Sequence, residues 1–152
     1  MELCIDTSTR YAGVGLTEGG SVIKSDTWHS KNNHTLELAA TVAQILEDAG
    51  KNAADVRSII IAKGPGGFSA LRVGVGFAKG ISESLGIPLV GVSTLELEAA
   101  RYFNESQRPL CPMVEVGRDR IAWSVYQKAT VGWSLSIDEQ VTTLDAMVDA
   151  VP

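Results

Sequence analysis

The sequence has few residues of the kinds that build covalent or metal-bound scaffolds. Its 152 residues include two cysteines, Cys4 and Cys111, and two histidines, His29 and His34. Two cysteines in separate apolar surroundings do not form a disulfide-rich or zinc-bound scaffold, so we expect buried, free thiols. The histidines lie five residues apart in a polar segment without a nearby third ligand, which makes only a weak metal site. We therefore expect no resident metal.

The chain also lacks a basic excess and a long apolar run. Its net charge is −5 and its pI about 5.0, whereas proteins that bind RNA or DNA directly usually carry a basic excess. No apolar run approaches membrane-spanning length, and no basic segment followed by an apolar run opens the sequence. We expect a soluble, cytoplasmic protein that meets nucleic acid only through a partner and does not contact a membrane.

Catalytic patterns are missing as well. The segments around Ser30, Ser69 and Ser93 offer no histidine and aspartate in a triad order, and no G-x-S-x-G motif is present. We expect this chain to contain no catalytic residues.

The sequence does contain a regular succession of strand and helix patterns. Three segments, "ELCID", "AGVGLT" and "SVIKSDTW", predict antiparallel strands joined by turns. A helix over 35–49 ends at Gly50, and "VRSIIIAKG" is typical of a buried strand. A second helix over 69–85, the short strand "PLVGVS" and the helix "TLELEAARYF" complete the first hundred residues. This order predicts an α/β fold, a mixed sheet with helices over its faces.

A smaller part follows residue 103. The segment "LCPMVEVGRDRIAWSVYQ" predicts two strands around a turn, "GWSLSIDEQVT" a third strand, and "TLDAMVDAV" a short helix. These strands either extend the first sheet or begin a second lobe. We divide the chain into an N-terminal lobe, residues 1–103, and a partial second lobe, residues 104–152.

Residues 64–80, "GPGGFSALRVGVGFAKG", hold six glycines and lead from a strand into a helix. Such a turn either cradles phosphate at the helix N-terminus or permits close packing. The stretch is not a Walker A loop, because no lysine followed by serine or threonine comes after the glycines. A turn capped by Ser69 still leaves anion contact open beside the plainer interpretation of a tight turn.

A second candidate phosphate loop is "IDTSTRYAGVGL". Asp6 ends a buried strand, and Thr7, Ser8 and Thr9 form the turn that follows. The carboxylate could meet a metal-bound phosphate and the turn could approach the phosphate oxygens. The local pattern favours the simpler alternative, a turn in which these side chains close a hairpin.

The two long helices carry more apolar surface than one sheet requires. The apolar arc of the helix over 35–49 covers more than half of its circumference, although a stripe about 100° wide would suffice. In the next helix, interior glycines cost about 1 kcal/mol each against alanine and demand a packing reason. The second contact lies either within the chain or with a partner subunit. The candidate partner surface comprises Leu36, Ala39, Ala43, Leu46, Val73, Gly76 and Gly80.

These segments together, over residues 3–127, resemble the TsaB (YeaZ) family, most specifically from Gly64 to Glu96. The resemblance implies an actin-like ATPase, ribonuclease H-like (ASKHA) fold and a non-catalytic subunit in tRNA N6-threonylcarbamoyladenosine synthesis. It implies three partners: the catalytic paralogue TsaD, the ATPase TsaE, and a second copy of the chain in isolation. It implies no cofactor of the chain's own, with ATP confined to an interface shared within the complex.

The resemblance also implies a lost metal site. Where TsaD has N-H-x-x-x-H after "GIPLVGV", this chain has "STLELEA", so that Ser93, Thr94 and Glu98 stand at the positions of the asparagine and the two histidines, and none of them is histidine. Members of the family usually run well past two hundred residues, and this chain is either a short member or a fragment. A stand-alone metallopeptidase, ATPase or sugar-kinase-like enzyme is the alternative function.

Overall fold

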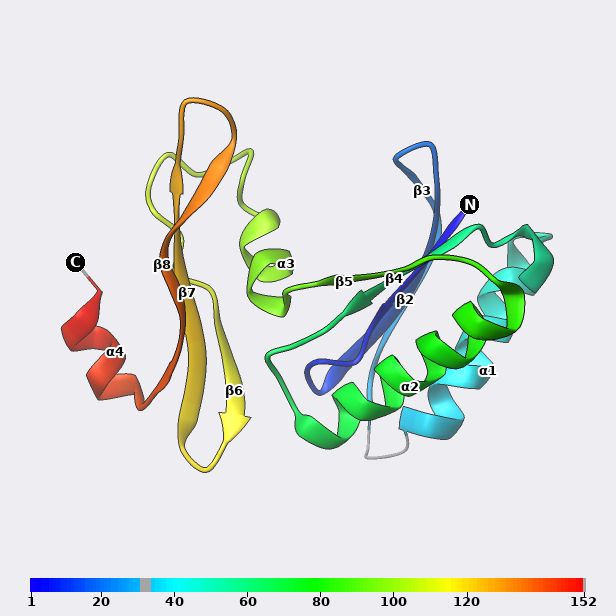
Figure 1. The fold of residues 1–152 in the computed structure, drawn as a ribbon, viewed down its shortest axis with the longest axis horizontal. Coiled ribbons are helices and arrows are strands. Elements are labelled where there is room, and N and C mark those ends of the chain that lie inside the picture. Colours follow the sequence, from blue (N-terminus) through cyan, green and yellow to red (C-terminus); the bar gives the residue numbers. More distant parts are fainter. Residues whose placement is uncertain (31–33, 152) are drawn as a thin grey trace.

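A computed structural model of the chain describes residues 1–30 and 34–151 (Figure 1). The described residues form two separate β-sheets, one of five strands and one of three. The five-stranded sheet has the order β3-β2-β1-β4-β5 and comprises β1 (Glu2–Asp6), β2 (Tyr11–Glu18), β3 (Ser21–His29), β4 (Ser58–Ala62) and β5 (Leu89–Val92). The strands of the smaller part therefore begin a second sheet and do not extend the first.

The first sheet is mixed because its connections differ in length. Short turns join β1 to β2 and β2 to β3, and both pairs are antiparallel. Helices α1 (His34–Asp48) and α2 (Phe68–Leu85) connect β3 to β4 and β4 to β5, and β4 pairs in parallel with β1 and β5. This arrangement confirms the predicted α/β fold of the actin-like type.

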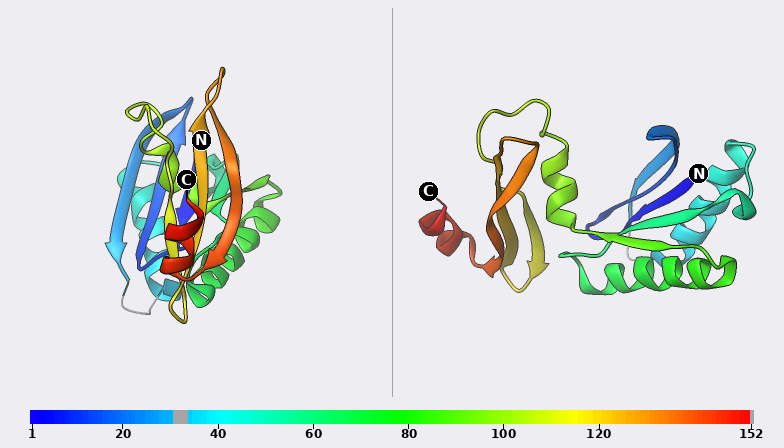
Figure 2. Two further views of the ribbon diagram at one scale, coloured as in Figure 1. Left: turned by 90° about the vertical axis from the view of Figure 1, so that its left-hand side faces the viewer. Right: turned by 45° about the horizontal axis from the view of Figure 1, so that its top comes forward.

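Both long helices cover the same face of the first sheet (Figures 1 and 2). Alternate residues of β1, β2 and β4 point into this layer, and Leu3, Leu16 and Ile59 are at most 1% exposed. Each such side chain contributes roughly 1.5–3 kcal/mol when fully buried. The helices add Leu38, Val42, Ile45 and Ala78 to the same core. The core thus fixes where α1 and α2 sit on the sheet.

Glycines end the two long helices as the sequence predicts. Gly50 has a φ of +64° just after α1, and Gly86 caps α2 in the left-handed conformation. The beginning of α2 differs from the expectation. Gly67 occupies the N-cap position without a side-chain cap, and Ser69 lies in the first turn, because the helix already begins at Phe68.

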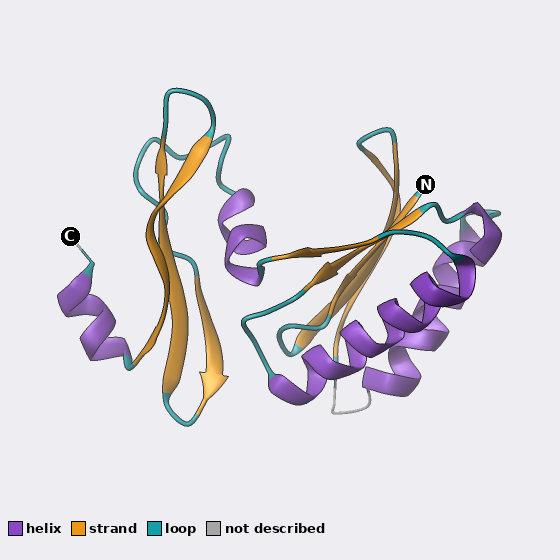
Figure 3. Cartoon of the chain, in the orientation of Figure 1, coloured by secondary structure: helices purple, strands orange, loops and turns teal. Residues whose placement is uncertain are grey.

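The second sheet is antiparallel, with the order β6-β7-β8. Its strands are β6 (Met113–Gly117), β7 (Arg120–Lys128) and β8 (Trp133–Thr142). Helix α4 (Leu144–Ala150) covers one face, where Met147 packs on Trp123 and Val125. Helix α3 (Thr94–Ala100) contacts β6 and β7 and stands between the two sheets (Figure 3). The division after residue 103 stays a prediction.

None of the helices in the described part of the chain is long and apolar enough to cross a membrane. A cis peptide bond joins Gly64 to Pro65 in the loop before α2.

Candidate functional site

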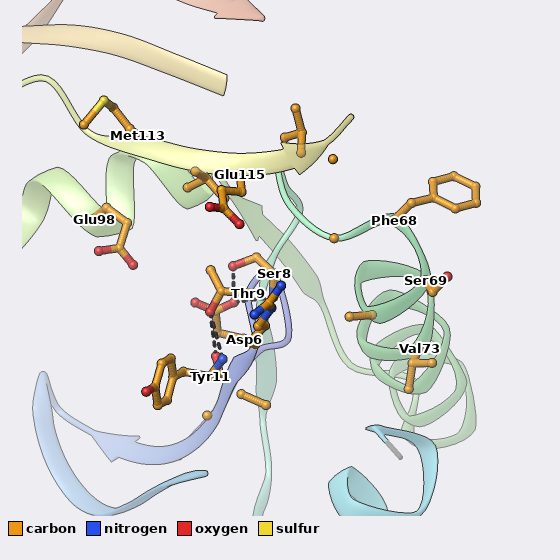
Figure 4. A pocket seen from close by; sticks show the side chains of 18 of the residues that line it. Asp6, Ser8, Thr9, Tyr11, Phe68, Ser69, Val73, Glu98, Met113 and Glu115 are labelled. Atoms are coloured by element: carbon orange, nitrogen blue, oxygen red, sulfur yellow. Dashed lines mark hydrogen bonds between the residues drawn. The ribbon is translucent and has the colours of Figure 1, made fainter. Parts of the chain in front are cut away.

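A cleft of about 1130 Å³ lies where the two sheets face each other (Figure 4). One wall is the turn between β1 and β2 together with the first turns of α2. The opposite wall comes from α3 and β6, which contribute Glu98, Arg101, Met113 and Glu115. The cleft therefore joins parts of the chain that are far apart in the sequence, and it includes Asp6, Ser8 and Thr9 from the candidate phosphate loop.

The turn between β1 and β2 is held by its own side chains. The Ser8 amide and the Ser8 hydroxyl both donate to Oδ1 of Asp6, over 2.8 and 2.6 Å. The Thr9 hydroxyl donates to the carbonyl of Tyr11 over 2.9 Å and accepts from the Tyr11 amide over 3.1 Å. These bonds close the hairpin in the way that Asp, Ser and Thr side chains stabilise turns. The phosphate role of this turn stays a prediction.

Thr7 faces away from the cleft and into the protein. Its side chain is fully buried, and its hydroxyl donates to the Ala70 carbonyl in the first turn of α2 over 2.8 Å. The amide of Gly67, the N-cap residue, donates to the Ser8 carbonyl over 2.8 Å. Two of the groups that a phosphate would need are thus already engaged in joining the turn to the helix.

Two glycines make this junction close. An added Cβ at Gly66 would lie 2.1 Å from the Ser8 carbonyl oxygen, and one at Gly74 would lie 2.2 Å from the Thr7 hydroxyl. Real Cβ atoms do not approach other atoms so closely, so both positions need glycine for the turn and α2 to meet. Of the three interior glycines of α2, Gly74 has its packing reason inside this chain.

Gly76 and Gly80 lie on the other side of α2. Both are exposed, and outside their own stretch of helix no atom of the described residues comes within 4 Å of an added Cβ. Of the rest of the candidate partner surface, Leu36 is 73% exposed, and Ala39 and Ala43 are exposed on α1.

Two members of the candidate partner surface are placed differently. Leu46 is 8% exposed and belongs to the core between α1 and the sheet, and Val73 is half-buried against the same core. Leu46 is turned inward because it shares the sheet-facing side of α1 with Ile45 and Val42. The described outer face of the two helices therefore consists of Leu36, Ala39, Ala43, Gly76 and Gly80, and we call it the α1–α2 outer face.

The positions that the sequence resemblance aligns with the N-H-x-x-x-H motif of TsaD lie at the N-cap of α3 and within this helix. Ser93 is the N-cap residue, Thr94 is fully buried with an unpartnered hydroxyl, and Glu98 pairs with Arg101 over 3.4 Å. Among the residues that the structure describes, no three His, Cys, Asp or Glu side chains gather closely enough to hold a metal ion. The side chain of His34, the second histidine of the weak metal pattern, lies outside the described residues.

The remaining groups of the cleft carry both signs of charge. Asp6, Glu98 and Glu115 supply carboxylates, and Arg10 and Arg101 supply guanidinium groups. Figure 4 shows Glu115 and Glu98 across the cleft from Asp6, with the ring of Phe68 pointing away from the turn. Sequence reasoning did not find Glu115 or Arg101 as site residues, because no local motif links them to Asp6, and it did not single out Arg10 although Arg10 lies in the candidate phosphate loop.

Both cysteines are free and half-buried, less buried than the sequence suggested. Burial raises the pKa of the Cys4 thiol, with smaller opposing and reinforcing effects from Thr17 and Glu2. Burial also raises the pKa of Cys111. A raised pKa keeps both thiols protonated at neutral pH, so neither has the thiolate character of a catalytic nucleophile.

Comparison with known proteins relates the whole arrangement to one group. Residues 22–151 match the family model described as TsaD, tRNA N6-adenosine threonylcarbamoyltransferase. The Bacillus subtilis tRNA threonylcarbamoyladenosine biosynthesis protein TsaB is 34% identical over 127 residues, which are 82% of this chain and 54% of that protein. The chain thus spans about half the length of this relative.

A catalytic relative and a solved structure extend the comparison. The tRNA N6-adenosine threonylcarbamoyltransferase of Porphyromonas gingivalis is 32% identical over 113 residues, 67% of this chain and 33% of that protein. The structure of YeaZ from Pseudomonas aeruginosa superposes with a TM-score of 0.83 at 28% identity, covering 92% of this chain and 66% of that one.

Proposed function

This chain belongs to the TsaB (YeaZ) branch of the TsaD family, and on that premise we propose that it is a non-catalytic scaffold subunit in tRNA N6-threonylcarbamoyladenosine biosynthesis. In this role it binds a TsaD-type catalytic paralogue through the α1–α2 outer face. A TsaE-type ATPase joins the complex, tRNA is met only through the partner, and the isolated chain pairs with a second copy of itself.

The observation that carries the proposal is the composition of the α1–α2 outer face. Ala39, Ala43, Gly76 and Gly80 are exposed small residues on two helices that lie side by side, and Leu36 adds one exposed, large apolar side chain. Small residues let the backbones of packed helices approach closely, a geometry best known from membranes that applies to any helix pair. The core of the sheet already has its own apolar layer, so this surface is left for another molecule.

The resemblance of the chain to both TsaB and threonylcarbamoyltransferase relatives supports a paralogue as partner. Two proteins of one fold can pair through equivalent helices, because each presents the same pair of elements to the other. The homodimer and the heterodimer then use the same face.

The non-catalytic assignment rests on α3. Ser93 and Thr94 offer hydroxyls, and Glu98 offers a carboxylate already paired with Arg101, in place of the imidazoles that a transition metal prefers. We expect elemental analysis of the purified chain to find no stoichiometric iron or zinc. One tightly held metal ion per chain, or ATP or peptide hydrolysis by the chain alone, would favour the stand-alone enzyme instead.

We also propose that the isolated chain holds no nucleotide cofactor, with ATP confined to an interface shared in the complex. The hydroxyls of the turn at Asp6–Thr9 already donate hydrogen bonds to the nearby backbone, to Asp6 and to α2. Replacing Asp6 by alanine should therefore leave partner binding largely intact. Calorimetry that finds micromolar ATP affinity, abolished by Asp6→Ala, would contradict this part.

Leucine substitutions on the α1–α2 outer face test the scaffold role. Gly76→Leu and Gly80→Leu should wedge the helices of the two subunits apart, since overpacking a close contact costs about 1–3 kcal/mol. Association with the TsaD-type paralogue, measured by calorimetry, should weaken about tenfold or more, because 1.4 kcal/mol corresponds to one decade. Light scattering should show the same loss for the homodimer.

Gly76→Ala is the matched control, because it adds a methyl group at the same exposed position without a bulky side chain. Circular dichroism should show that all three variants keep their helical content. Undiminished association of both leucine variants would place the partner surface elsewhere on the molecule.

A further inference from the structure

Helix α2 has two sides that face different parts of the molecule. Its outer side carries Gly76 and Gly80 on the α1–α2 outer face, and its first turns lie against the turn at Asp6–Thr9, which lines the cleft. One helix thus contributes to both surfaces, and Figure 4 shows its first turns beside the turn that contains Ser8 and Thr9. The first turns of α2 line the cleft beside the turn, and the junction between α2 and the turn connects the turn to the rest of the helix.

That junction consists of contacts that leave little freedom. The Thr7 hydroxyl donates to the Ala70 carbonyl over 2.8 Å, and the Gly67 amide donates to the Ser8 carbonyl over 2.8 Å. Thr7 and Ser8 are both fully buried, so water cannot replace these bonds easily. Gly66 and Gly74 permit an approach that any Cβ would prevent.

The junction is buried and hydrogen-bonded, and its glycines let the turn and α2 lie in close contact, so we expect the turn and α2 to move together. We propose that Thr7 is a positioning residue that couples the cleft to the α1–α2 outer face, so that docking of a partner on α2 makes the junction, and with it the turn at Asp6–Thr9, open less often. Coupling of this kind is reciprocal, and a molecule bound in the cleft strengthens partner docking by the same factor.

The inference rests on the proposed function, since it needs a partner on the α1–α2 outer face. The inference adds that a partner docked on the α1–α2 outer face changes how often the turn in the cleft opens, although the partner does not contact the cleft. Thr7 acts through Ala70 and α2, and the partner itself does not touch Thr7.

Hydrogen exchange measured by mass spectrometry tests the coupling directly. In the wild-type chain, addition of the TsaD-type paralogue should slow exchange of the peptides that contain the Ser8 and Gly67 amides by about fivefold or more, the lower end of coupling between sites. The Gly67 amide donates across the junction to the Ser8 carbonyl, and the Ser8 amide donates to Asp6 within the turn, so their exchange reports the opening of the junction and of the turn.

Two variants at one position separate the hydroxyl from the shape of the side chain. Thr7→Val keeps the volume of the side chain and removes its hydrogen-bond donor. The paralogue should therefore no longer slow hydrogen exchange in the turn, and the Kd of the paralogue for the variant chain should be about fivefold higher than for the wild type. Thr7→Ser keeps the donor and should restore both properties. Val125→Ala, in the buried core of the second sheet, controls for a general loss of stability.

The outcomes distinguish this inference from the proposed function. If the wild-type chain binds neither the paralogue nor a second copy, the proposed function fails. If it binds the paralogue but exchange of the turn is unchanged, the coupling is refuted, and this measurement needs no variant. Equal protection and equal Kd in the wild type and in folded Thr7→Val would refute the role of Thr7.

Discussion

At the scale of single residues, the glycines of α2 differ in what surrounds them. Gly74 is buried against Thr7, whereas Gly76, two residues later, is exposed and open. The same residue type thus serves internal packing at one position and surface shape at the other. Helix geometry explains the difference, because positions two apart point to nearly opposite sides of a helix.

Alanine substitutions at these two positions should have opposite effects on stability. Gly74→Ala forces a methyl group against the Thr7 hydroxyl and should lower the free energy of unfolding by about 1–2 kcal/mol, after allowing for the better helix propensity of alanine. Gly76→Ala meets nothing and should raise it by about 0.5–1 kcal/mol. Urea unfolding followed by circular dichroism measures both.

If both variants are stabilised, the junction between α2 and the turn is looser than the structure places it. If both are destabilised, Gly76 is covered by some part of the molecule after all.

At the scale of elements, α1 is fixed to the edge of the sheet by a polar contact as well as by its core side chains. Oε2 of Glu37 accepts a hydrogen bond from the Trp28 indole over 3.0 Å and one from the Ser30 hydroxyl over 2.5 Å. Trp28 lies on β3, the outermost strand of the sheet, and Ser30 is 6% exposed just after it. The carboxylate therefore ties the first turn of the helix to the strand that precedes it.

Replacing Glu37 by glutamine should weaken this tie without changing its shape. A hydrogen bond to a charged group contributes about 1.5–3 kcal/mol and a neutral one about 0.5–1.5, so we expect a loss of about 1–2 kcal/mol in the free energy of unfolding. Glu47→Gln, at an exposed position of the same helix, is the matched control and should change stability by less than about 0.5 kcal/mol. Equal effects of the two variants would contradict the role of Glu37.

At the scale of the whole molecule, the two sheets have separate cores. One is built from β1, β2, β4 and the two long helices, and the other from Trp123, Val125 and Met147. Helix α3 follows β5 directly in the chain yet contacts β6 and β7. Its buried residues Leu95 and Ala99 therefore depend on the second sheet for their packing.

Exchange of the α3 amides should accordingly follow the stability of the second sheet. Met147→Ala removes a buried side chain of that sheet, at a cost of about 2–5 kcal/mol, and should speed hydrogen exchange in α3 and β7 while β1 and β4 stay protected. Ile59→Ala, in the core of the first sheet, should speed hydrogen exchange in β1 and β4 while α3 and β7 stay protected. If exchange in α3 responds to Ile59→Ala and not to Met147→Ala, α3 belongs with the first lobe, in agreement with a division after residue 103.

The sequence predicted the elements of this fold well because local patterns determine them. Alternating apolar residues mark β1 and β2, an apolar run marks β4, and Gly50 and Gly86 mark the ends of the long helices. The hairpin turn after Asp6 is equally local, since its hydrogen bonds join residues two apart. None of these features needs a contact with a distant part of the chain.

The sequence alone was less informative where a contact with a distant part of the chain determines the position of a side chain. The sequence placed Leu46 on the partner surface, although its side chain is buried. The apolar side of α1 is wider than contact with one sheet requires, and the sequence does not say which part of that side faces the sheet. It did not find Glu115 or Arg101, which reach the cleft only because the second sheet and α3 stand opposite β1.

Sequence by itself therefore determined the order of strands and helices, the turn chemistry and the family, all of which depend on residues close together or on whole patterns. Only the tertiary structure decided that Gly66 and Gly74 join the turn to α2 and that Gly76 and Gly80 remain exposed. The physical reason is that a glycine has no side chain whose polarity would predict whether the position is buried or exposed. Its role is set by the atoms that approach it from elsewhere in the fold.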